Sequence, residues 1–281
     1  MYLATLLVAC SSDPPFSGND GGGAWTGKPL SACDESPKAQ PGARTIVTVV
    51  VDPTYAGKPV VFGELFALPN GGTLTVSNFR FFASDLQVVI AGGQLVAVDI
   101  VAPDGKPVPY NVHLVNAASA SEMTFQLAVP AGDYTGMSLI FGLNDACIRR
   151  DPSVSKPPLT YQSQMTWPPP FGFLFLRYES KVTGATGPDA PLAAVAVGGF
   201  PGYVFAPRIQ APGAFQVAGT SGITVHLRVA LDEMFKAALL PFDPITAAPP
   251  IPGPPGTEIE VGDHLLKNAD KVSIFSLTAG L

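Results

Sequence analysis

Short apolar segments separated by turn residues recur along the chain from residue 44 onward. Thr45–Val51 is a β-branched run, and Thr73–Ile90 is long enough for two strands or one bent strand. Further strands are predicted over residues 60–68, 94–101, 123–129, 136–141, 193–199, 203–205 and 222–229. Because strands follow one another roughly every ten residues with no helix between them, the pattern predicts an all-β fold, an antiparallel β-sandwich with Greek-key-like connections.

Helical periodicity is confined to the C-terminal part of the chain. Apolar residues fall at positions i, i+3, i+4, i+7 and i+8 from Leu231, which predicts an amphipathic helix that ends at Pro241. Residues 263–277 are compatible with a second short helix. We therefore expect one or two short helices near the C-terminus.

The stretch from Met165 to Glu179 combines two unusual features. Trp167, one of two tryptophans, is followed by three prolines that fix φ and remove three backbone donors. Residues 171–176 then place phenylalanine at every second position, as a buried strand does. A tryptophan held at the entry of a buried strand is either packed in the core or part of a built site, and both interpretations remain open.

Composition excludes several classes of protein. Of the 281 residues, 47% are hydrophobic and 14% charged, with 29 glycines and 30 prolines, as in proteins built of short strands and turns. The net charge of −6 and the lack of a basic patch argue against a nucleic-acid partner. No apolar run reaches the ~20 residues of a transmembrane helix. Without a nucleophile elbow, a phosphate-binding loop or a spaced acid pair, a non-catalytic protein is expected.

The N-terminus has features of an exported lipoprotein. Leu7–Cys10 is similar to a bacterial lipobox, in which Cys10 would be lipidated, although an ordinary buried strand is the alternative. Residues 11–43 are predicted to be a flexible tether, because the Gly-, Pro- and Ser-rich start of this segment cannot build a core. The sequence thus predicts a signal segment over 1–10, the tether, and a single domain over 44–281. Ser11 after the cysteine favours the outer membrane, so we expect a periplasmic or cell-surface lipoprotein.

Two cysteines remain besides Cys10. Cys33 and Cys147 are expected to form a disulfide, because paired cysteines are the usual state in an exported chain. Two unpaired buried thiols are the alternative.

Four stretches in order along residues 45–277 resemble the MbnP-like copper-binding proteins, a periplasmic family associated with methanobactin loci. They are FRFFASDL at Phe79–Leu86, GDYTGMSLIFG at Gly132–Gly142, the stretch around Trp167, and a tail that joins Ile223–Phe235 to Asn268–Leu277. The chain is identified as a divergent member of this family. Pro169 stands at the family's second tryptophan, and residues 196–198 lack its histidine.

The resemblance implies a copper cofactor and a Trp167 that a di-haem peroxidase-like partner oxidises to kynurenine. Copper favours imidazole and thioether ligands, so the candidate metal ligands are His113, His226 and Met165. The histidines and Trp167 also have simpler structural explanations. His226 alternates with polar residues on a solvated strand face, and His113 is a structural hydrogen-bonding residue. Trp167 is then a packed aromatic residue. The alternative function is a cell-surface binding module that holds carbohydrate or protein on Trp167 and nearby phenylalanines.

Overall fold

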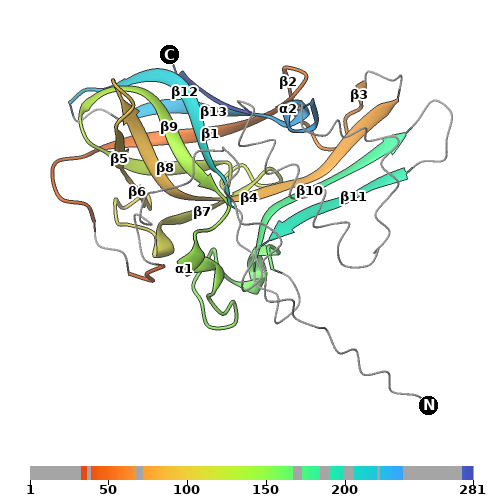
Figure 1. Cartoon of the computed structure of the whole chain (residues 1–281), viewed down its shortest axis with the longest axis horizontal. Helices are drawn as coiled ribbons and strands as arrows, with labels where there is room; N and C mark the ends of the chain where they lie inside the picture. The colour runs from red at the N-terminus through yellow and green to blue at the C-terminus, as the bar shows by residue number, and fades with distance from the viewer. Residues whose placement is uncertain are drawn as a thin grey trace, which may run out of the picture.

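The computed structural model describes most of the β-rich part of the chain (Figure 1). The described residues are 33–36, 39–67, 72–166, 173–183, 190–198, 206–219, 222–236 and 274–280. Cys10, Trp167 and most of the predicted C-terminal helix region lie outside these ranges, so the predictions on them are not addressed by the geometry below.

Two sheets pack face to face, as the sequence predicted. The first, six-stranded in the described part of the chain, has the order β14 (Phe275–Ala279), β13 (Ile223–Ala230), β1 (Thr45–Tyr55), β8 (Thr124–Val129) and β6 (Asp99–Val101), and β2 (Lys58–Pro59) pairs with β1. All its pairs are antiparallel except β1 with β13, which is parallel. The fold is therefore a β-sandwich with one parallel pair that the strand pattern did not predict.

The second sheet is organised around the long strand β4 (Thr73–Ile90). Its described strands follow the order β11 (Ala190–Gly198), β10 (Leu174–Thr183), β4, β9 (Gly132–Phe141) and β12 (Arg208–Val217). The strands β3 (Phe66–Ala67), β5 (Leu95–Ala97) and β7 (Val112–Asn116) also pair with β4. Figure 1 shows β10 and β11 extending beside the first half of β4, away from β9 and β12.

The part of the core between the two sheets is rich in phenylalanine. Phe79 and Phe81 of β4 are fully buried. The ring of Phe81 lies 4.8 Å from that of Phe141 in its own sheet and 6.0 Å from that of Phe275 in the opposite sheet. Because side chains alternate along a strand, Arg80 and Phe82 must project from the other face of β4. This second face is where the segment before Trp167 lies.

A bulge bends β4 at its middle, so the long 73–90 segment is one bent strand. The pairing of β4 with β9 shifts between Ser84 and Gln87, and Asp85 in the gap has φ 45°. A left-handed backbone is uncommon for residues other than glycine, and asparagine and aspartate tolerate it best. The extra residue re-aims the second half of β4 along β9.

Helical structure is sparse in the described residues. It comprises the 3₁₀ turns η1 (Pro109–Asn111) and η2 (Tyr161–Ser163) and the helices α1 (Asp145–Ile148) and α2 (Leu231–Lys236). The helix predicted from Leu231 is confirmed as far as Lys236, whereas α1 was not predicted. Of the range 263–277, in which a second short helix was expected, residues 275–277 belong to β14 and residues 263–273 lie outside the described residues. No helix among the described residues is long and apolar enough to cross a membrane.

Candidate functional site

The described chain fixes both ends of the stretch that contains Trp167. Thr166 and Phe173 form an isolated antiparallel bridge, and the backbone N–H of Leu174 donates to the carbonyl oxygen of Met165 at 2.8 Å. The ring of Phe173 lies 6.1 Å from that of Phe82, edge to face. Residues 167–172 therefore connect two positions that are held at the face of β4 that carries Arg80 and Phe82.

Two arginines bind the turn that precedes Met165. Arg80 of β4 donates from Nη1 to the carbonyl oxygen of Ser163 at 3.2 Å and to Oε1 of Gln164 at 2.9 Å. Arg177 of β10 donates from Nη1 to the carbonyl oxygen of Gln164 at 3.1 Å, and its Nη2 pairs with Glu179 at 2.6 Å. Burial, together with the neighbouring Arg177, lowers the pKa of Arg80. The turn is held by charged side chains of two paired strands.

Met165 is fully buried. Its backbone N–H donates to Oγ of Ser163 at 3.2 Å and its carbonyl oxygen accepts from Leu174. The residue packs as part of the hydrophobic core, so its thioether stabilises the segment leading to Trp167.

His113 lies between the sheets. Its ring stacks 4.7 Å from that of Phe125, a buried residue of β8, and its Nε2 is 2.8 Å from the carbonyl oxygen of Glu122. Burial lowers the pKa of His113, which keeps the ring neutral. Nε2 is then the donor of this hydrogen bond, so the lone pair of the neutral ring is on Nδ1, within buried surroundings.

His226 lies on the outer face of the six-stranded sheet, because its neighbours Val225 and Leu227 point into the core. Its Nδ1 is 2.7 Å from Oδ2 of Asp52 on β1, and both side chains are about half exposed. A carboxylate on one ring nitrogen fixes the tautomer and orients the other nitrogen, as in many metal sites. The Asp52–His226 pair was missed by sequence reasoning, because only the parallel register of β1 and β13 brings residues 174 positions apart together.

The three candidate ligands do not meet. His226 faces solvent beyond one sheet, His113 lies between the sheets, and Met165 belongs to the segment against the far face of the other sheet. The described residues also contain no group of three or more His, Cys, Asp or Glu side chains placed to hold a metal ion. They therefore do not fit a complete copper site, and of the two candidate histidines His226 is the one that is about half exposed and hydrogen-bonded to a carboxylate.

A buried polar cluster surrounds the bulge of β4. Asn144 donates from Nδ2 to Oδ1 of Asp85 at 3.3 Å and caps α1 by accepting the N–H of Cys147 on its Oδ1 at 2.9 Å. Arg208 of β12 donates from Nη1 to the carbonyl oxygen of Asp85 at 3.0 Å and to Oε1 of Gln87 at 2.8 Å. Burial lowers the pKa of Arg208, and the negative charge of nearby Asp85 partly offsets this lowering. These contacts explain how the irregular backbone at Asp85 is held.

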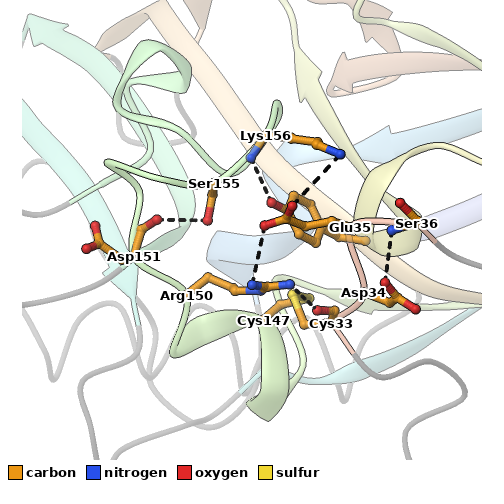
Figure 2. A network of polar contacts seen from close by, with 10 residues as sticks. Cys33, Asp34, Glu35, Ser36, Cys147, Arg150, Asp151, Ser155 and Lys156 are labelled. Carbon is orange, nitrogen blue, oxygen red and sulfur yellow. Dashed lines mark hydrogen bonds and ion pairs between the residues drawn. A yellow bond between two sulfur atoms is a disulfide. The ribbon is translucent and has the colours of Figure 1, made fainter.

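The predicted disulfide between Cys33 and Cys147 is present and ties the N-terminal segment to α1 (Figure 2). The two Cα atoms are 4.8 Å apart. Arg150 donates from Nη2 to the carbonyl oxygen of Cys33 at 2.7 Å and pairs through Nη1 with Glu35 at 3.4 Å. Lys156 lies 3.8 Å from the other oxygen of Glu35. The described end of the predicted tether is thus docked on the domain rather than free of it.

Comparison with known proteins identifies the family. Residues 44–247, well over half of the chain, match the MbnP family profile. A solved structure, MbnP from Methylosinus trichosporium, has the same fold: the TM-score is 0.54 at 17% sequence identity, over 85% of this chain and 100% of that chain. No curated protein matches the sequence. The chain therefore belongs to the MbnP family.

Proposed function

We propose that this protein is an exported copper-binding protein of MbnP type, in which Trp167 is the oxidisable residue. The observation that carries the proposal is the family match over residues 44–247, because this range contains the whole stretch around Trp167. The fixed positions of Thr166 and Phe173 on either side support a built site, since a functional side chain needs a rigid surround.

His226 is the described residue best suited to bind copper. Its Nδ1–H faces the carboxylate of Asp52 at 2.7 Å, which leaves Nε2 as a lone-pair donor toward solvent. Cu(II) is the divalent first-row ion that nitrogen ligands bind most strongly. The remaining ligands of a complete site must come from other parts of the chain than His113 and Met165, because neither lies on the outer face of the six-stranded sheet that carries His226.

Export and partner follow from the same proposal. Cys10 is the lipidated residue that anchors the chain to the outer membrane, facing the periplasm or the cell surface. A di-haem peroxidase-like enzyme is the partner that oxidises Trp167, and the protein itself is not a catalyst. The disulfide supports an oxidising compartment, in which such bonds persist.

Copper titration of the purified exported protein tests the proposal. Binding is followed by calorimetry and by the Cu(II) electron paramagnetic resonance spectrum, which reports nitrogen ligands. His226→Ala is expected to remove a nitrogen ligand from the spectrum, and Asp52→Asn to weaken binding about 10–100-fold through the orientation of the ring. His113→Ala is the matched control. Absence of copper uptake, with and without the di-haem partner, contradicts the proposal.

A surface binding module remains the second candidate, on a separate observation. Val154 and Tyr161, in the segment between α1 and β10, are 76% and 44% exposed although both are large and apolar. Both residues belong to the segment that leads to the stretch around Trp167, which this candidate function uses as its contact platform. This candidate predicts that Tyr161→Ala abolishes binding to immobilised glycans or to a cell-surface protein, with copper having no effect.

A further inference from the structure

Arg80 and Arg177 are direct cross-strand partners on the outward face of the β4–β10 pair. Two like charges opposite each other on neighbouring strands destabilise a sheet. Here the cost is larger, because Arg80 is partly removed from water and its pKa is lowered by burial and by Arg177. An arrangement of this kind persists where other groups offset the repulsion.

The groups that offset it belong to one turn. The Ser163 carbonyl oxygen, the Gln164 carbonyl oxygen and Gln164 Oε1 accept hydrogen bonds from the two guanidinium groups, at 3.2, 3.1 and 2.9 Å. Hydrogen bonds from charged donors are about twice as strong as neutral ones. Gln164 itself is left-handed, with φ 56°, so the turn presents both of its acceptor oxygens toward the arginines. Glu179 accepts the remaining contacts of Arg177.

The same turn leads without interruption to Trp167. The N–H of Met165 donates to Oγ of Ser163, and the carbonyl oxygen of Met165 accepts from Leu174. Thr166 then bridges to Phe173. Each residue from Ser163 to Thr166 is therefore bound either to an arginine or to Phe173 and Leu174, where β10 begins.

We propose that Arg80 and Arg177 are positioning residues that hold the backbone before Trp167 in place before any metal or partner binds. This inference rests on the proposed function in naming Trp167 as the reactive side chain. It makes the approach to the site a preformed part of the fold, with its rigidity supplied by β4 and β10. Neither arginine is assigned a contact with copper.

Trp167 fluorescence tests the proposal in protein made without the di-haem partner, so that the indole stays intact. Trp25→Phe leaves Trp167 as the single tryptophan. In this background Arg80→Gln and Arg177→Gln are expected to increase acrylamide quenching about twofold and to lower the fluorescence anisotropy, because the indole gains motion on the nanosecond scale. Arg44→Gln is the matched control, since Arg44 also shares one Nη1 between two acceptors, the carbonyl oxygens of Ala97 and Ala128.

A second variant separates positioning from general loss of structure. Gln164→Gly removes one acceptor and keeps the left-handed turn, which glycine adopts freely, so it is expected to increase quenching without change in far-UV circular dichroism or melting temperature. Unchanged quenching and anisotropy in all three folded variants overturns the proposal. These fluorescence measurements need no copper. A failure of copper binding in the parent protein therefore contradicts the proposed function, whereas this inference is decided by the quenching and anisotropy data alone.

Discussion

Asn144 links the disulfide-bearing helix to the bulge of β4 by bonding Asp85 through Nδ2 and the N–H of Cys147 through Oδ1. One buried side chain thereby serves the irregular backbone of β4 and the start of α1. Removing the Asn144 side chain takes a hydrogen bond from two buried groups at once, the Asp85 carboxylate and the Cys147 N–H. Asn144 should therefore affect stability more than its size suggests.

Asn144→Ala is expected to lower the free energy of unfolding by about 2–4 kcal/mol, through the lost helix cap and the lost contact with Asp85. Urea unfolding followed by circular dichroism measures the change. Asn116→Ala is the control, because Asn116 bonds the half-buried Glu122 in a loop and should cost under about 1 kcal/mol. Equal losses for the two variants would show that the Asn144 link has no special role.

The disulfide encloses a long loop and should contribute strongly to stability. With a sequence separation of 114 between Cys33 and Cys147, the chain-entropy relation gives about 4–5 kcal/mol. Cys33→Ser with Cys147→Ser is therefore expected to reduce the urea midpoint greatly, and Glu35→Gln, which leaves the bridge intact, only slightly. A midpoint that stays unchanged in the double variant contradicts this account of the N-terminal segment.

The close approach of β12 and β14 depends on Gly213. A Cβ at this position would collide with the backbone oxygen of Leu277. Gly213→Ala is expected to destabilise the protein by about 3 kcal/mol or more and to increase hydrogen exchange in β14. Gly219→Ala, with φ 66° and no atom near the added carbon, carries the backbone cost alone, about 1 kcal/mol. Similar losses in the two variants would rule out the collision.

His113 should make stability depend on pH in the mildly acidic range. Its folded pKa is lowered by burial, so the unfolded chain binds a proton that the folded chain does not. Stability is then fully present above the ordinary histidine pKa of about 6.5 and falls as the pH drops from there toward the lowered pKa of the folded state. His113→Gln is expected to flatten this slope below about pH 6.5. Melting temperature against pH measures the change, and a slope retained in His113→Gln contradicts the assignment.

The pattern of apolar and β-branched residues predicted the strands well where that pattern was strong. The β-branched run from Thr45 became β1, and the segment 73–90 became a single strand. The predicted strand over 60–68 survives only as Phe66–Ala67, because the rest of this apolar segment forms a loop. Strand β12 was missed, since Pro212 and Gly213 within it resemble a turn. There Pro212 still pairs with β9, and the register shifts between Pro212 and Phe215.

Pairing between strands that are far apart in the sequence limited how much of the candidate site could be predicted. The parallel register of β1 and β13 decides that Asp52 reaches His226, and residues so far apart carry no local signal for it. Strand alternation directs His226 to the outer face of the six-stranded sheet, whereas His113 belongs to β7 of the other sheet, and ligand chemistry alone does not reveal this separation. The polar face predicted around His226 is confirmed, because alternation along a single strand is a local property.

Copper bound per chain in the exported protein, measured with Trp167→Phe beside Trp25→Phe, tests the central claim most directly. We predict that protein made with the di-haem partner binds copper, that peptide mass spectrometry finds Trp167 converted to kynurenine, and that Trp167→Phe loses the copper while Trp25→Phe keeps it. Unmodified Trp167 with no copper uptake, or equal copper in the two variants, would contradict the claim.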